Sequence, residues 1–67
     1  MSGPPYRVEL RAGDDPEPRL LNITMSIEAA ERILQEVATT LRPGEVVHVR
    51  DSAGALVLER ARAPVWR

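Results

Sequence analysis

Residues 26–42, SIEAAERILQEVATTLR, form the stretch of the chain with the strongest helical period. Apolar side chains recur there at alternating intervals of three and four residues, on one face of a helix: Ile27, Ala30, Leu34, Val37 and Leu41. Ser26 is a favourable N-cap, and Pro43 disfavours helical geometry at Arg42, so we expect a helix that ends at about Leu41. Pro43-Gly44 then fits the centre of a type II turn. A helix with one apolar stripe needs a surface to pack on, and the flanking segments are expected to supply it.

The residues before the helix have the two-residue period of strands. Residues 6–12 alternate between apolar and charged side chains, with Tyr6, Val8, Leu10 and Ala12 on one face. Residues 19–25 form a second predicted strand, in which Leu21, Ile23 and Met25 are expected to face the helix and Leu20, Asn22 and Thr24 to face away. Residues 13–18 join these strands as a long, acidic hairpin loop.

Two further strands are predicted after the helix, at residues 45–50 and 55–61. Residues 51–54, Asp-Ser-Ala-Gly, join them, and Gly54 can adopt a positive φ angle. A four-residue loop pairs Arg50 with Ala55. It then sets Val49 against Leu56 and Val47 against Leu58 on the helix side. The opposite side carries Val46, His48, Val57 and Glu59.

The element order β-β-α-β-β predicts an α+β fold, with a four-stranded, mainly antiparallel sheet and one helix packed on one face. We expect a single domain over residues 6–62, a flexible leader over residues 1–5 and a C-terminal tail over residues 63–67. The expected core contains Val8, Leu10, Leu21, Ile23, Met25, Ile27, Ala30, Leu34, Val37, Leu41, Val47, Val49, Leu56 and Leu58.

Composition narrows the classes of function. With 67 residues and no cysteine, the chain is too small to bury a large core and has no disulfide or thiolate zinc site to stabilise it. The net charge of −1 disfavours nucleic-acid binding. Neither a membrane-spanning run nor a signal-peptide pattern is present, so a cytoplasmic protein without a membrane partner is expected.

Two groups of residues could suggest a catalytic site or a metal site, and both have a simpler interpretation. His48, Asp51 and Ser52 contain the residue types of a hydrolase triad, but no oxyanion-hole motif accompanies them, and Asp51 and Ser52 fit a turn. Asp14, Asp15 and Glu17 could ligate a cation, but two prolines interrupt the run and calcium-loop spacing is absent. We therefore expect no enzymatic activity, no metal and no cofactor.

The apolar residues that face away from the helix are the more informative feature. If adjacent strands bring them together, they form a surface that favours a partner. The expected interface contains Leu20, Val46, His48, Val57, Val65 and Trp66. The two edge strands could also pair with another chain. The sequence thus predicts a non-enzymatic protein-interaction or oligomerisation module, which uses the open sheet face or a sheet edge and has a second copy or another protein as its partner.

The arginines support an alternative, a small-ligand or nucleic-acid binder at a subunit junction. The candidate anion contacts are Arg7, Arg11, Arg50, Arg60 and Arg62. Tyr6 and Trp66 could stack on bases, but the strands lack the paired aromatics of RNA-binding sheets, and glutamates dilute the positive charge. A third interpretation is a subunit that only completes a larger enzyme.

Overall fold

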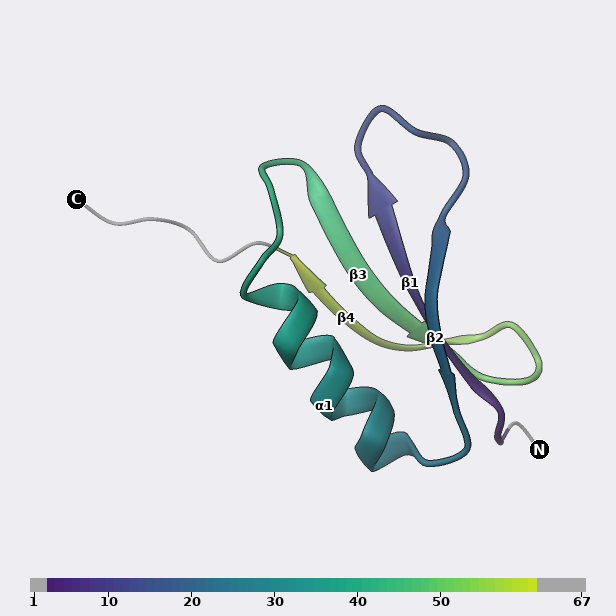
Figure 1. Cartoon of the computed structure of the whole chain (residues 1–67). Coiled ribbons are helices and arrows are strands. Elements are labelled where there is room, and N and C mark those ends of the chain that lie inside the picture. Colours follow the sequence, from purple (N-terminus) through teal and green to yellow (C-terminus); the bar gives the residue numbers. More distant parts are fainter. Residues whose placement is uncertain (1–2, 62–67) are drawn as a thin grey trace.

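The structure is a computed structural model, and it describes residues 3–61. Within these residues four strands form one antiparallel sheet, and one helix lies on one of its faces (Figure 1). The elements are β1 (Tyr6–Ala12), β2 (Arg19–Thr24), α1 (Ile27–Ala38), β3 (Glu45–Arg50) and β4 (Leu56–Ala61). The predicted α+β fold with β-β-α-β-β order is confirmed.

The strand order in the sheet is β2-β1-β3-β4, so the two hairpins meet through β1 and β3. In that central pair Val8 lies opposite Val49 and Leu10 lies opposite Val47. Directly opposed residues of antiparallel strands share a face, so these four side chains lie together on the helix side. β2 and β4 form the two edges of the sheet.

Helix α1 begins as predicted and ends earlier than predicted. The Ser26 hydroxyl caps it by accepting a hydrogen bond from the Ala29 N–H at 3.4 Å. The last helical residue is Ala38, because the hydroxyls of Thr39 and Thr40 bond back to carbonyl oxygens three residues earlier, at 2.7 Å and 2.9 Å. Such local bonds compete with continued helix.

The predicted turn after the helix is present. The Glu45 N–H donates to the Arg42 carbonyl oxygen at 3.0 Å, and Gly44 between them has a φ of 84°. A positive φ at the third position is the defining feature of a type II turn, which glycine adopts without steric cost.

The core lies between α1 and the central strands. Among the described residues its buried apolar members are Val8, Ala30, Leu34, Leu41, Val47 and Val49. Partly buried side chains surround them: Tyr6, Leu10, Ile33, Val37, Ala38 and Leu58. Four residues of the predicted stripe therefore contribute to the core: Ala30, Leu34, Val37 and Leu41. Ile27, also expected there, is not among the core residues, and Leu41 lies beyond the end of α1.

The predicted orientation of β2 is wrong. Leu21, Ile23 and Met25 were expected in the core, but all three are exposed, Ile23 by 53% and Met25 by 70%. Asn22 lies opposite Val8 and so occupies the helix side of the sheet in place of its neighbours.

A β-bulge explains this difference. Val8 pairs with Asn22 and Glu9 pairs with Leu20, which leaves Leu21 as an extra residue in β2. The extra residue breaks the alternation of faces along the strand. Leu20 and Ile23 consequently both lie on the open face, the sheet face away from α1. Nothing in residues 19–25 marks the bulge, since the segment contains no glycine.

The predicted register of the second hairpin is also wrong. Val49 pairs with Leu58, not with Leu56, and Arg50 pairs with Leu56. A second bulge places Leu56 and Val57 together opposite Arg50. Leu56 therefore lies outside the core, with 51% of its surface exposed.

The β3–β4 loop spans residues 51–55 and is built around Asp51. The Asp51 Oδ1 accepts hydrogen bonds from the Ala53 and Ala55 N–H groups at 2.9 Å and 3.0 Å. This pattern stabilises a five-residue loop in place of the expected four-residue loop. The Ser52 N–H donates to the Gly3 carbonyl oxygen at 2.9 Å, so the segment that precedes β1 contacts the loop.

Candidate functional site

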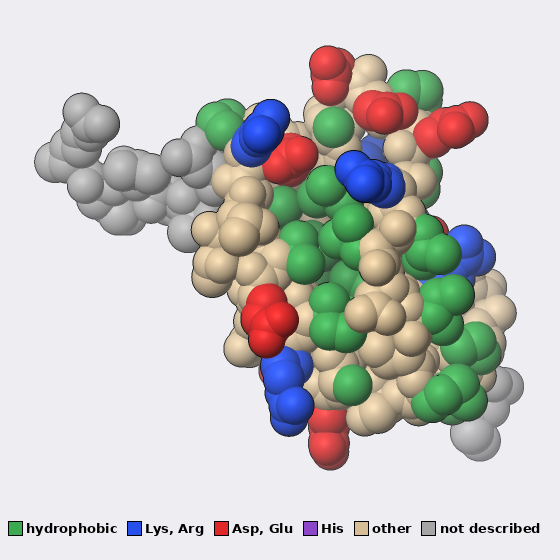
Figure 2. Space-filling view, in the orientation of Figure 1, with side chains coloured by type: hydrophobic (Ala, Val, Ile, Leu, Met, Phe, Trp, Pro, Cys, Tyr) green, Lys and Arg blue, Asp and Glu red, His purple; other side chains and the backbone are tan. Residues whose placement is uncertain are grey.

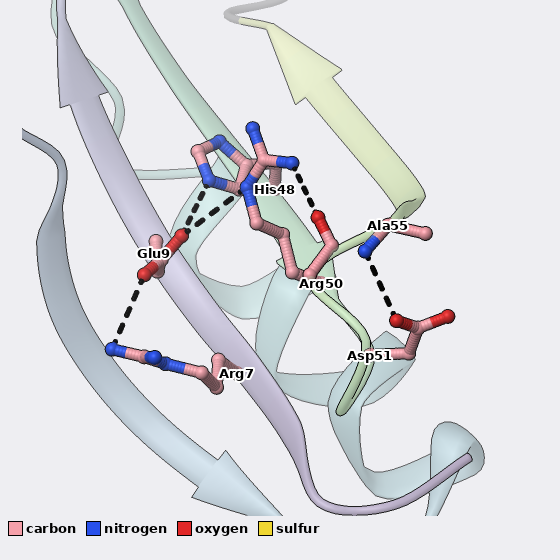
Figure 3. Close-up of polar contacts among 7 residues, drawn as sticks. Arg7, Glu9, His48, Arg50, Asp51 and Ala55 are labelled. Carbon is pink, nitrogen blue, oxygen red and sulfur yellow. Dashed lines mark hydrogen bonds and ion pairs between the residues drawn. The ribbon is translucent and has the colours of Figure 1, made fainter. Parts of the chain in front are cut away.

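The open face of the sheet carries a group of charged side chains, which we call the open-face cluster: Arg7, Glu9, His48 and Arg50 (Figure 3). Arg7 lies opposite Arg50 and Glu9 lies opposite His48, in adjacent rows of the central β1–β3 pair. The register of two strands that are distant in sequence thus brings the four side chains together.

Glu9 is the centre of the open-face cluster. Its Oε1 lies 2.8 Å from His48 Nε2 and 3.6 Å from Arg50 Nε, and its Oε2 lies 3.7 Å from Arg7 Nη2. Glu9 and His48 are only 7% and 4% exposed, although α1 covers the other face of the sheet. A buried carboxylate is costly without hydrogen bonds or opposite charge, and these three partners offset that cost.

The two arginines of the open-face cluster remain accessible. The side chains of Arg7 and Arg50 are 53% and 40% exposed. Arg50 Nη1 also donates to the Gly54 carbonyl oxygen at 2.9 Å, which ties the guanidinium to the β3–β4 loop. Both arginines can therefore reach a molecule in solvent.

Two depressions flank Arg50. The first, of about 430 Å³, is lined by Pro5, Arg7, Glu9, Arg50 and loop residues 51–54. The second, of about 300 Å³, is lined by Arg11, Gly13, Gly44, Val46, His48, Arg50 and Glu59. Both open on the face of the sheet away from the helix, where a small ligand has access.

The predicted anion contacts do not all lie on one face. Arg7, Arg11 and Arg50 lie on the open face, because Arg11 lies opposite Val46, two residues from His48 on β3. Arg60 lies opposite Val47 and so belongs to the helix side, where its Nη1 donates to the Glu59 carbonyl oxygen at 2.9 Å. Arg62 lies outside the described residues.

The predicted interface residues occupy several places. Leu20, Val46 and His48 lie on the open face, but Glu9 separates Leu20 from His48 across the strands. Val57 is exposed at the bulge of β4. Val65 and Trp66 lie outside the described residues. The centre of the open face is therefore charged, and its apolar residues lie around that centre.

Four of the six large exposed apolar side chains among the described residues lie along one sheet edge, which we call the β2 edge: Leu20, Leu21, Ile23 and Met25. The other two, Leu56 and Val57, lie on β4 at the opposite edge. Figure 2 shows hydrophobic side chains at the surface alongside β2. The Ile23 N–H donates to the Asn22 side-chain oxygen at 2.8 Å, so a local side chain satisfies this strand donor.

Sequence reasoning missed two features of these surfaces. Glu9 alternates outward on the first predicted strand, which was the available signal, but its partner His48 is 39 residues away. The β2 edge was missed because Leu21, Ile23 and Met25 were expected in the core. Strand order decides the first feature and the β-bulge at Leu21 decides the second, and the sequence pattern predicted neither.

Comparisons with protein-family models, curated proteins and solved structures found no match. The described residues contain no group of three or more acidic or histidine side chains placed to hold a metal ion. Within that same part of the chain, no helix has the length and apolar character needed to cross a membrane. The fold and surfaces define a small α+β domain with a charged open face and an apolar edge strand.

Proposed function

We propose that this chain is a non-enzymatic association module that forms a homodimer by antiparallel pairing of β2 with β2 of a second copy. The observation that carries the proposal is the β2 edge, an edge strand with exposed apolar side chains and no charged residue after Arg19. An edge strand of this kind has the backbone groups and the apolar surface that strand addition uses. On pairing, the Ile23 N–H would exchange its bond to the Asn22 side chain for one to the partner strand.

The composition of β2 supports a native partner. Natural edge strands usually carry lysine, proline or inward-pointing charges that prevent pairing with other chains. Residues 20–25, Leu-Leu-Asn-Ile-Thr-Met, contain none of these, and the bulge at Leu21 disturbs only the first part of the strand. The other edge strand, β4, carries Glu59 and Arg60 and is better protected. A partner on β2 would remove an edge that otherwise favours aggregation.

A second copy of the chain fits this edge for two reasons. Antiparallel pairing about a two-fold axis satisfies the same edge on both chains and leaves no further β2 edge open. Arg19, the one charged residue of β2, lies at its start. In such a pairing each Arg19 lies beside the uncharged end of the other strand, so like charges do not oppose each other.

The test is the oligomeric state of Ile23→Lys, measured by sedimentation equilibrium from micromolar to millimolar concentration. Ile23 is exposed and lies on the open face, so a lysine leaves the core intact and places a charge in the proposed interface. We expect the wild type to be dimeric and the variant to be monomeric and folded.

Val57→Lys is the matched control, since Val57 is also exposed but lies on the opposite edge of the sheet. It should remain a dimer. A wild type that is monomeric at millimolar concentration contradicts the proposal. Loss of the dimer in Val57→Lys, with retention in Ile23→Lys, would place the interface on β4 instead.

A further inference from the structure

We infer that the pocket between Arg7, Arg50 and the β3–β4 loop binds a small organic phosphate through its phosphate group. The pocket lies on the open face, and its recognition side chains come from β1 and β3. The proposed site does not depend on pairing of β2.

The first argument is the direct opposition of two like charges. Arg7 and Arg50 face each other across the β1–β3 pair. Like charges at directly opposed positions of a sheet destabilise it unless an anion lies between them. Glu9 supplies one negative charge for both arginines, so the two guanidiniums can accept a second anion.

The second argument is the position of the Glu9 carboxylate. It makes its short contact, 2.8 Å, with His48, and its contacts with Arg50 and Arg7 are 3.6 Å and 3.7 Å long. The contacts to arginine are longer than an N–H···O hydrogen bond, which spans about 2.7–3.2 Å. Most N–H donors of the two guanidiniums therefore remain available to a ligand.

The other carboxylate of the lining, Asp51, is oriented toward the loop. Its Oδ1 accepts from the Ala53 and Ala55 N–H groups. Figure 3 shows the Asp51 side chain pointing toward Ala55 and away from Glu9 and Arg7. These two hydrogen bonds direct the Asp51 Oδ1 toward the loop.

The chemistry of the pocket favours a phosphate ester. The N–H groups of residues 51–55 all donate within the protein, so the arginine side chains and the Ser52 hydroxyl must provide recognition. A guanidinium presents paired donors that match two oxygens of a phosphate. A phosphate ester has enough oxygens to accept from both arginines at once, and the volume of about 430 Å³ leaves room for an organic group beside Pro5 and Ala53.

The test is a titration of the full chain with ribose 5-phosphate, followed by the backbone amide NMR shifts, with ribose as the control ligand. We expect a saturable response at Arg7, Arg50 and Ser52 for the phosphate and none for ribose. Arg7→Gln and Arg50→Gln should each weaken binding by about tenfold, the usual effect of losing hydrogen bonds to a charged group.

Arg32→Gln is the matched control, because it removes the same charge from an exposed position of α1. It should bind as the wild type does. Arg50→Lys keeps the charge without the forked donors and should also weaken binding, which covers the case in which Arg50→Gln does not fold.

Four outcomes overturn the inference. The first is no saturable response to ribose 5-phosphate at millimolar concentration. The second is equal weakening by Arg7→Gln and Arg32→Gln, which indicates nonspecific attraction. The third is wild-type binding by Arg50→Lys. The fourth is tighter binding of a single-stranded oligonucleotide with steep salt dependence, which indicates a nucleic-acid backbone as the ligand.

Discussion

At the scale of single residues, the contacts of Glu9 connect the charged open face of the sheet with the register of its two central strands. It is one of few buried charged side chains among the described residues, and its partners come from both central strands. A slip of one residue between β1 and β3 would move Glu9 relative to His48 and would also misplace Val8 and Val49. The carboxylate therefore helps specify the register on which the hydrophobic core depends.

Glu9→Gln tests this role. The amide keeps the size of the side chain but removes the charge that lies between Arg7 and Arg50, and it weakens the contact with His48. We expect a loss of about 1–3 kcal/mol in the free energy of unfolding, measured by urea denaturation. Glu59→Gln, on an exposed residue opposite His48, should change it by less than about 0.5 kcal/mol. Equal stability of the two variants would contradict a structural role for Glu9.

The position of His48 away from the helix could be predicted from alternation along its strand, and it was. Its contact with Glu9 could not, because that contact depends on β1 lying beside β3. The alternation of residues along a strand determines which face of the sheet a side chain lies on. The order of the strands in the sheet determines which side chains it contacts. The interface and anion-contact roles assigned to the surface residues stay predictions.

At the scale of elements, the regular segments were predictable and the bulges were not. The period of the helix stripe and the strand alternation fixed α1, β1 and β3 to within a few residues. The bulges at Leu21 and Val57 each add one residue to an edge strand, and neither has a local signal. Because faces alternate residue by residue, one extra residue was enough to misplace Ile23 and Leu56.

Gly54→Ala tests how far the β3–β4 loop depends on backbone conformation. Gly54 has a φ of 83°, and an added Cβ would meet no atom within 4 Å. The cost therefore comes from the left-handed backbone alone, about 1–2 kcal/mol in the free energy of unfolding by urea denaturation. Gly3→Ala is the control, because Gly3 also has open space but no positive φ, and it should be close to neutral. A Gly54→Ala variant as stable as the wild type would show that the loop relaxes to another conformation.

At the scale of the whole molecule, the helix covers only one face of the sheet. The described core has six buried apolar residues, and no cysteine is available for a disulfide. The apolar residues of β2 stay partly exposed in the single chain, Ile23 by 53%, and none of them belongs to the buried core. Pairing of β2 with a second copy would bury these side chains in the interface, so folding and association should be coupled in this small domain.

That coupling predicts a melting temperature that depends on protein concentration. Association of folded chains stabilises them by mass action, whereas unfolded chains do not associate. For a dimer of this size, a tenfold rise in concentration should raise Tm by about 3–6 °C, measured by calorimetry or circular dichroism. Ile23→Lys should melt at a temperature independent of concentration, and at low concentration it should match the wild type, because its core is unchanged. A wild-type Tm that stays constant from micromolar to millimolar concentration would contradict the coupling.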